Sequence, residues 1–101
     1  MHFALICIDK PDAMETRLAT RAAHLDYVRK SNVALGGPFL NEAGEMIGSL
    51  IVIEAEDLAK ARAWAENDPY ARAGLFERVD VRPFRAAIGS WVSGPSIPPA
   101  G

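Results

Sequence analysis

The chain has 101 residues, a net charge of −2 at pH 7, 50% apolar residues and a single cysteine, which together are typical of one globular domain in a reducing compartment. The acidic balance argues against nucleic acid as the main partner, and Cys7 alone cannot build a disulfide framework. The apolar run near the start is too short for a signal peptide or a membrane span, so we expect a cytoplasmic protein without a membrane partner.

The first two predicted elements are a strand and a helix. Residues 2–8 form a short apolar run with β-branched and aromatic side chains, which is typical of a strand. Asp12 is followed by Glu15 at capping-box spacing, so we expect Asp12 to cap a helix over residues 13–30. Apolar residues at three- and four-residue spacings predict the face that this helix turns toward the sheet: Met14, Leu18, Ala22, Leu25 and Val28.

Three further strands and a second helix are predicted along the rest of the chain. They cover residues 33–40 (strand), 46–54 (strand), 58–67 (helix) and 75–84 (strand). Asp57 is expected to cap the second helix, and the dipeptide Asp68-Pro69 to end it, because a residue before proline disfavours the α region. From Arg85 onward the chain is rich in glycine, serine and proline, which predicts an arm with one apolar spot at Trp91-Val92.

The order βαββαβ predicts an α+β protein, a ferredoxin-like domain in which both helices cover one face of a four-stranded antiparallel sheet. The strands over residues 2–8 and 46–54 carry apolar side chains on both faces, so the second face needs another cover. We expect a second copy to pack sheet to sheet, giving a homodimeric α/β barrel, with a higher oligomer also open. The alternative is that the C-terminal arm folds back over its own sheet. We place the domain at residues 1–88 and the arm at 89–101.

His24 and Asp68 are the candidate catalytic residues. His24 lies at the border of the predicted apolar face of its helix, and histidine is the side chain that titrates nearest neutrality. Asp68, at the end of the second helix, could hold the imidazole in one tautomer as a triad carboxylate does. The βαββαβ order lays the two helices side by side, which would bring the pair together. Both residues also have plain structural interpretations: a border histidine with local hydrogen bonds, and an Asp-Pro turn.

Five residues are candidates for contacting a bound small molecule: Arg17, Gly37, Pro38, Ser49 and Tyr70. Ser49 could offer a hydroxyl, and Gly37 and Pro38 could let the backbone approach a ligand. Arg17 or Arg21 could steer an anion. Each has a structural alternative, namely a small residue within a strand, an irregular sheet edge, or a solvated helix face. No Cys, His and carboxylate spacing resembles a metal site and no glycine pattern resembles a phosphate loop, so we expect no metal and no cofactor.

Several short motifs, in their order and spacing, resemble those of the YCII-related (YciI-like) proteins. They are His24-Leu25-Asp26-Tyr27, Gly37-Pro38-Phe39, Gly48-Ser49, Asp68-Pro69-Tyr70, Ala73-Gly74-Leu75-Phe76 and Val81-Arg82-Pro83-Phe84. The resemblance covers residues 2–88. It implies the ferredoxin-like dimeric α/β barrel, together with a cleft centred on a histidine/aspartate pair that corresponds here to His24 and Asp68.

The family resemblance does not specify a reaction. One relative is a dehydrochlorinase acting on chlorinated hydroxyhydroquinones, and the wider barrel superfamily includes muconolactone isomerases and cofactor-free monooxygenases. We therefore expect a cofactor-independent enzyme of isomerase or lyase type that acts on a small aromatic or carbonyl-containing molecule. His24 would transfer the proton and Asp68 would orient His24. Two other interpretations stay open: a dimeric module that binds a metabolite without turnover, and a structural barrel whose arm mediates larger assembly.

Overall fold

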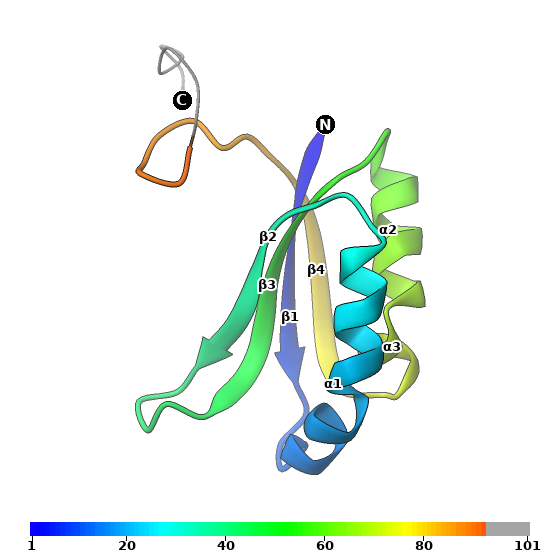
Figure 1. Cartoon of the computed structure of the whole chain (residues 1–101), viewed down its shortest axis with the longest axis vertical. Coiled ribbons are helices and arrows are strands. Elements are labelled where there is room, and N and C mark those ends of the chain that lie inside the picture. The colour runs from blue at the N-terminus through cyan, green and yellow to red at the C-terminus, as the bar shows by residue number, and fades with distance from the viewer. Residues whose placement is uncertain (93–101) are drawn as a thin grey trace.

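The structure, a computed structural model, describes residues 1–92 and contains a four-stranded antiparallel sheet with its helices on one side (Figure 1). The elements in chain order are β1 (His2–Asp9), α1 (Met14–Arg29), β2 (Val33–Leu40), β3 (Met46–Glu54), α2 (Leu58–Asn67), α3 (Pro69–Arg72) and β4 (Phe76–Phe84). The strand order is β2-β3-β1-β4, so β1 and β3 are the central strands. The predicted α+β, ferredoxin-like fold is confirmed.

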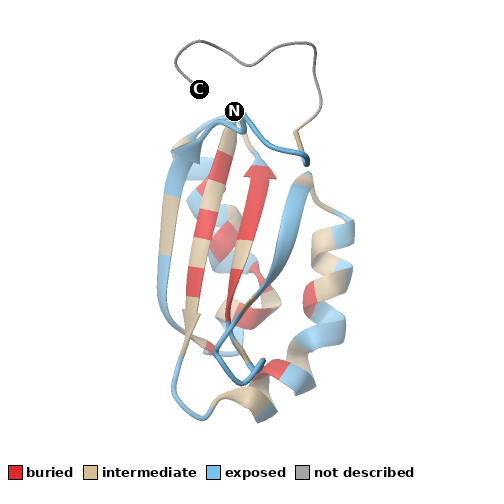
Figure 2. Ribbon diagram, turned by 90° about the vertical axis from the view of Figure 1, so that its left-hand side faces the viewer, coloured by how far each residue is buried: buried red, intermediate tan, exposed pale blue. Residues whose placement is uncertain are grey.

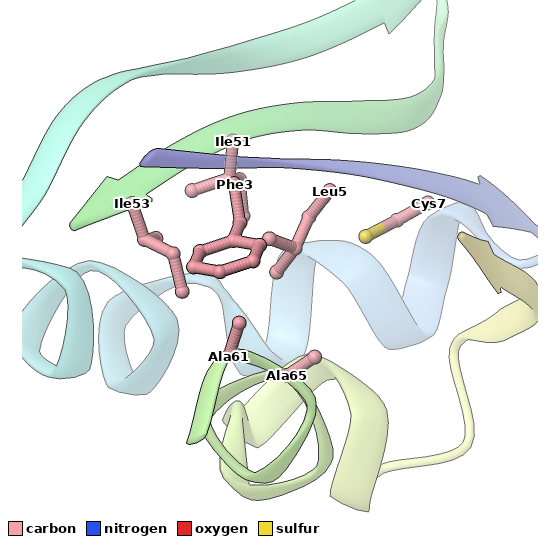
Figure 3. Packing of buried hydrophobic residues seen from close by; sticks show 7 residues of the cluster. All are labelled: Phe3, Leu5, Cys7, Ile51, Ile53, Ala61 and Ala65. Carbon is pink, nitrogen blue, oxygen red and sulfur yellow. The ribbon is translucent and has the colours of Figure 1, made fainter. Parts of the chain in front are cut away.

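The hydrophobic core lies between the central strands and α2 (Figure 3). Its buried cluster consists of Phe3, Leu5, Cys7, Ile51, Ile53, Ala61 and Ala65. Phe3 is opposite Ile53 in the antiparallel register, so both side chains point to the helical face of the sheet. Ala61 of α2 is fully buried beneath them. Because alanine side chains are short, α2 can pack closely on the sheet at these positions.

Helix α1 is rotated relative to the face predicted from its apolar residues. Its buried side chains are Arg17 and His24, whereas Leu18 is 57% exposed and Ala22 is also exposed. The predicted apolar face is therefore wrong at Leu18 and Ala22, whereas Met14, Leu25 and Val28 are half-buried. The physical reason is that both polar side chains have buried partners on other elements, and such pairing makes the burial of polar groups tolerable.

The predicted Asp12 cap of α1 is also wrong, whereas the predicted Asp57 cap of α2 is confirmed. Ala13 occupies the N-cap position of α1 and its side chain makes no capping hydrogen bond. Asp12 has a φ angle of 55°, in the left-handed region, and an N-cap residue instead needs an extended backbone. At α2 the carboxylate of Asp57 accepts a hydrogen bond from the Lys60 backbone N–H at 2.9 Å, in the expected capping geometry.

Within residues 1–92, no helix lies over the second face of the sheet (Figure 2). Its central strands carry half-buried or buried apolar side chains: Ala4, Ile6, Ile8, Leu50 and Val52. Residues 85–92 lie beside one end of this face, next to Leu35 and Val52, with Trp91 83% exposed. Residues 85–92 therefore cover only an end of the face. The dimer and the domain boundary at residue 88 stay predictions, and most of the predicted arm, residues 93–101, lies outside the described residues.

Between residues 1 and 92, no helix is both long and apolar enough to cross a membrane. Cys7 is buried, as expected for a small apolar residue on the helical face of β1.

Candidate functional site

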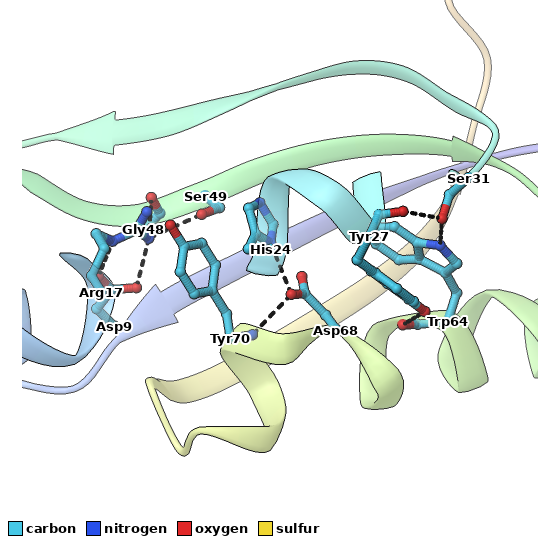
Figure 4. Close-up of polar contacts among 10 residues, drawn as sticks. All are labelled: Asp9, Arg17, His24, Tyr27, Ser31, Gly48, Ser49, Trp64, Asp68 and Tyr70. Carbon is cyan, nitrogen blue, oxygen red and sulfur yellow. Dashed lines mark hydrogen bonds and ion pairs between the residues drawn. The ribbon is translucent and has the colours of Figure 1, made fainter. Parts of the chain in front are cut away.

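His24 of α1 and Asp68, which lies between α2 and α3, form a buried polar pair (Figure 4). Nδ1 of His24 lies 2.8 Å from Oδ1 of Asp68, and the two side chains are 10% and 2% exposed. A carboxylate only accepts hydrogen bonds, so Nδ1 carries the proton and donates it to Asp68. In the neutral imidazole this tautomer leaves the lone pair on Nε2, at the edge of the ring away from Asp68.

Asp68 has a second partner, which explains why the local sequence places it there. The backbone of Asp68 is extended, with φ −59° and ψ 129°, as expected before Pro69. Its Oδ1 accepts a hydrogen bond from the Tyr70 backbone N–H at 2.9 Å and so caps the short helix α3. One carboxylate oxygen therefore both caps α3 and orients the imidazole. The two roles expected for Asp68, a turn residue and a partner of His24, therefore both involve Oδ1.

Tyr70 forms a wall against the imidazole. Its ring stacks on the His24 ring with centroids 4.0 Å apart and an interplanar angle of 15°, and Phe76 contacts the Tyr70 ring edge-on. Tyr70 is 2% exposed. Burial raises the pKa of Tyr70, although the charges of Arg17 and Arg21 oppose this effect. The Tyr70 hydroxyl therefore stays protonated at neutral pH and remains able to donate a hydrogen bond.

Arg17 is 3% exposed and is held from two sides. Its guanidinium donates to both carboxylate oxygens of Asp9, at 2.7 and 2.9 Å. It also donates to the Gly48 carbonyl at 2.9 Å and to the Ser49 hydroxyl at 3.0 Å. Burial opposes the charge, but the hydrogen bond and the negative charge of Asp9 outweigh it, so the pKa of Arg17 is raised.

These contacts set the hydrogen-bonding role of Ser49. Because the Ser49 oxygen accepts from Arg17, its own proton is free to point elsewhere. Gly48 leaves no space for a side chain, since a Cβ there would collide with the carbonyl oxygen of Cys7. The pair Gly48-Ser49 thus lets β3 run close to β1 while Ser49 offers a donor on the helical face.

A cavity of about 290 Å³ lies between α1 and strands β2 and β3. Its lining residues are Arg17, Arg21, His24, Leu25, Val28, Val33, Gly36, Gly37, Pro38, Met46, Ser49, Ile51 and Tyr70. Helix α2 packs on β1 and β4, whereas α1 packs mainly on α3, and this difference leaves room above β2 and β3. A Cβ at Gly37 would meet no other atom within 4 Å, consistent with an open wall at that strand.

The structure brings the predicted site residues together. All five predicted ligand-contact residues line the cavity with His24, and Asp68 lies behind His24 as its hydrogen-bond partner. Arg21, which was expected only as an alternative to Arg17 for steering an anion, also lines the cavity. Its position four residues after Arg17 and three before His24 puts the three on one helix face. Asp9, the partner of Arg17, was missed, because nothing in the local pattern after the first strand distinguishes it from a turn residue.

The arrangement can transfer a proton and stabilise negative charge on an oxygen. His24 supplies an acceptor, and the hydroxyls of Ser49 and Tyr70 supply donors, inside a cavity whose other walls are mostly apolar. The residues described hold no group of three His, Cys, Asp or Glu side chains placed to bind a metal ion. By their own chemistry, His24, Ser49 and Tyr70 can support general acid–base catalysis.

The chain was compared with known proteins. Residues 1–85 match the YCII-related domain. Protein YciI of Escherichia coli O6:H1 is 36% identical over 84% of this chain and 97% of its own length. An Emericella nidulans protein, derivative of benzaldehyde biosynthesis cluster protein C, is 35% identical over 60% of this chain and 74% of its own length.

Among solved structures, this chain is similar to the 5-chloro-2-hydroxyhydroquinone dehydrochlorinase TftG of Burkholderia phenoliruptrix AC1100, solved in complex with 2,5-dihydroxybenzoquinone. The TM-score is 0.78 at 32% identity, over 84% of this chain and 94% of TftG. Together with the domain match over residues 1–85, these similarities show that the chain belongs to the YCII-related family.

Proposed function

We propose that this protein is a cofactor-independent enzyme that moves a proton on a small aromatic or carbonyl-containing molecule, in an isomerisation or an elimination. The observation that carries the proposal is the 2.8 Å contact that commits Nδ1 of His24 to a buried carboxylate while His24 lines a cavity. A histidine held in this way presents Nε2 as a base. Buried polar pairs next to a cavity are typical of catalytic sites.

The reaction begins when Nε2 of His24 takes a proton from a carbon or hydroxyl of the bound molecule. The bonding electrons move toward a carbonyl oxygen, and the Ser49 and Tyr70 hydroxyls stabilise the negative charge that develops there. Asp68 stabilises the imidazolium that forms. In an isomerisation the imidazolium returns the proton at another position. In an elimination a leaving group departs as the electrons reorganise.

The comparisons support this class of reaction. Dehydrochlorination is the loss of a proton and a chloride ion, which is an elimination of the kind just described, and TftG is a dehydrochlorinase at 32% identity. The name of the fungal relative associates it with the biosynthesis of a benzaldehyde derivative, which is a small aromatic compound. The cavity of about 290 Å³ lies at the low end of ligand pockets, which span about 300–1,000 Å³, so a single-ring molecule is the appropriate size.

The proposal is tested by proton exchange. The protein is incubated in D₂O with a panel of hydroxyquinones and cyclic enols, including 2,5-dihydroxybenzoquinone, and deuterium incorporation at carbon is followed by NMR. Catalysed incorporation that falls by about 10²–10⁴-fold in His24→Gln is expected. Arg29→Gln, which changes an exposed residue of α1 outside the cavity, is the control. Exchange that is unchanged in His24→Gln would contradict the role of His24.

A binding module is the second candidate, because Asp68 caps α3 and its contact with His24 can also be structural. This candidate predicts saturable binding of 2,5-dihydroxybenzoquinone, no catalysed exchange with any member of the panel, and unchanged binding in Asp68→Asn. The side-chain amide of that variant would keep an acceptor for both N–H groups and remove only the charge.

We also propose that two copies pair through the open face of the sheet. The half-buried side chains of Ile6 and Leu50 are the support, since an apolar sheet face without a helix needs a cover. Light scattering is expected to give twice the chain mass for the wild type and a monomer for Ile6→Asp. A wild-type protein that is monomeric at micromolar concentration would contradict the pairing.

A further inference from the structure

The cavity is lined by basic side chains and by no acidic side chain. Its lining includes two arginines and one histidine. Arg17 is neutralised by Asp9, which contacts it with both carboxylate oxygens from within the protein. His24 is held by Asp68 through a hydrogen bond at Nδ1. Two of the three basic side chains therefore have buried acidic partners behind the cavity wall.

Arg21 is the exception. It lines the cavity from the exposed side of α1, and none of the ion pairs found within residues 1–92 includes it. Its position on α1 is three residues before His24, about 4.5 Å along the helix axis. Its charge also acts on the buried Tyr70 hydroxyl, where it opposes the effect of burial. Arg21 thus supplies the one positive charge in the cavity lining that has no ion-pair partner within residues 1–92.

The other residues that line the cavity determine what kind of molecule can bind beside Arg21. Leu25 and Val28 of α1 face Val33, Met46 and Ile51 of the sheet side across the cavity. Such walls favour an apolar ring and disfavour a polar or cationic body, because unpaired polar groups are costly to desolvate. A dianion such as a phosphate ester would bring two charges to one uncompensated arginine.

We infer that the cavity selects a flat molecule with a single ring and one negative charge, a carboxylate or an enolate, and that Arg21 determines this specificity by binding the anionic group. The ring lies between the apolar walls, and its reacting atom faces His24. This inference rests on the proposed function, since it concerns the same cavity. It adds the charge of the substrate and names Arg21 as the residue that binds the charged group.

The test uses benzoate and benzamide, two probes of nearly the same shape that differ in charge. Dissociation constants are measured by calorimetry for the wild type, Arg21→Gln, Arg21→Lys and the control Arg29→Gln. We expect benzoate to bind more tightly than benzamide in the wild type. Arg21→Gln should weaken benzoate about tenfold, equal to about 1.4 kcal/mol, and leave benzamide within about twofold. Arg21→Lys should restore part of the benzoate affinity, Arg29→Gln should change neither probe, and added salt should weaken only benzoate.

Equal binding of the two probes by the wild type, no binding of benzoate at millimolar concentration, or an Arg21→Gln variant that retains benzoate affinity would each overturn the inference. His24→Gln separates it from the proposed function. If His24→Gln keeps the benzoate preference while the wild type catalyses no proton exchange, the enzyme proposal fails and the specificity stands. If exchange depends on His24 but Arg21→Gln binds benzoate normally, only the specificity fails.

Discussion

The two long helices cover the same face of the sheet in different ways. Helix α2 buries Ala61 and Ala65 against the apolar side chains of the central strands, whereas α1 buries Arg17 and His24. The first arrangement is a close-packed core. The second leaves a cavity and keeps its polar groups paired with Asp9 and Asp68. Helix α1, which buries Arg17 and His24 while Leu18 is exposed, therefore belongs to the half of the fold in which we propose the site.

The largest expected effect on stability belongs to the α1 half. Arg17→Met should lower the free energy of unfolding by about 3–5 kcal/mol, because it leaves the Asp9 carboxylate buried without its partner. Urea unfolding measures the change. The double variant Asp9→Asn with Arg17→Met should recover part of the loss, since it removes both charges. A single variant as stable as the wild type would show that the pair does not organise α1.

The next effect concerns the α2 half and tests its close packing. Ala61→Leu should cost about 1–3 kcal/mol, because Ala61 is fully buried and the added carbons meet the core side chains. Its effect on benzoate binding should be small, since Ala61 does not line the cavity. An Ala61→Leu variant that stays stable but loses benzoate binding would contradict the distinction between the packed core at α2 and the cavity at α1.

Cys7 of β1 is expected to make the free energy of unfolding depend on pH. Burial, with the charges of Asp68 and Asp9, raises the pKa of the Cys7 thiol to about 12. The unfolded thiol titrates near pH 8.5, so between these values the folded state holds the proton more tightly than the unfolded state. The contribution of this proton to the free energy of unfolding is fully present below about pH 8.5. It is lost as the pH rises, by up to about 1.4 kcal/mol per pH unit.

Urea midpoints measured between about pH 8 and 10 should therefore fall more steeply for the wild type than for Cys7→Ala. The window stops there because burial also raises the pKa values of Tyr27 and Tyr70, which contribute at higher pH. Equal slopes for the two proteins would contradict the assignment to Cys7.

The smallest effect is expected at Leu18. Although the apolar pattern predicts it as a core residue, it is 57% exposed on α1. Leu18→Ala should therefore change the free energy of unfolding by less than about 0.5 kcal/mol. A loss of about 2 kcal/mol or more, as expected for truncation of a buried leucine, would mean that α1 faces the sheet as its apolar residues suggested.

The sequence predicts those features that depend on neighbours along the chain. The order of elements, the Asp57 cap and the break at Asp68-Pro69 follow from local backbone preferences. The rotation of α1 does not, because Arg17 finds Asp9 and Ser49, and His24 finds Asp68, on other elements of the fold. A prediction from apolar spacing alone places charged side chains on the exposed face, because it takes no account of partners on other elements. The motif resemblance located His24 and Asp68, but only the fold shows Arg21 on the same cavity.

The proposed function requires that Asp68 fixes the tautomer of His24 and leaves Nε2 for chemistry. ¹⁵N NMR of the imidazole rings at neutral pH tests it most directly, and only two histidines need to be assigned. His2 is an internal control, because it contacts Glu54 through Nε2 at an exposed site. We predict that neutral His24 carries its proton on Nδ1 in the wild type and loses this preference in Asp68→Ala. A proton on Nε2 of His24 in the wild type, or no change in Asp68→Ala, would contradict the account.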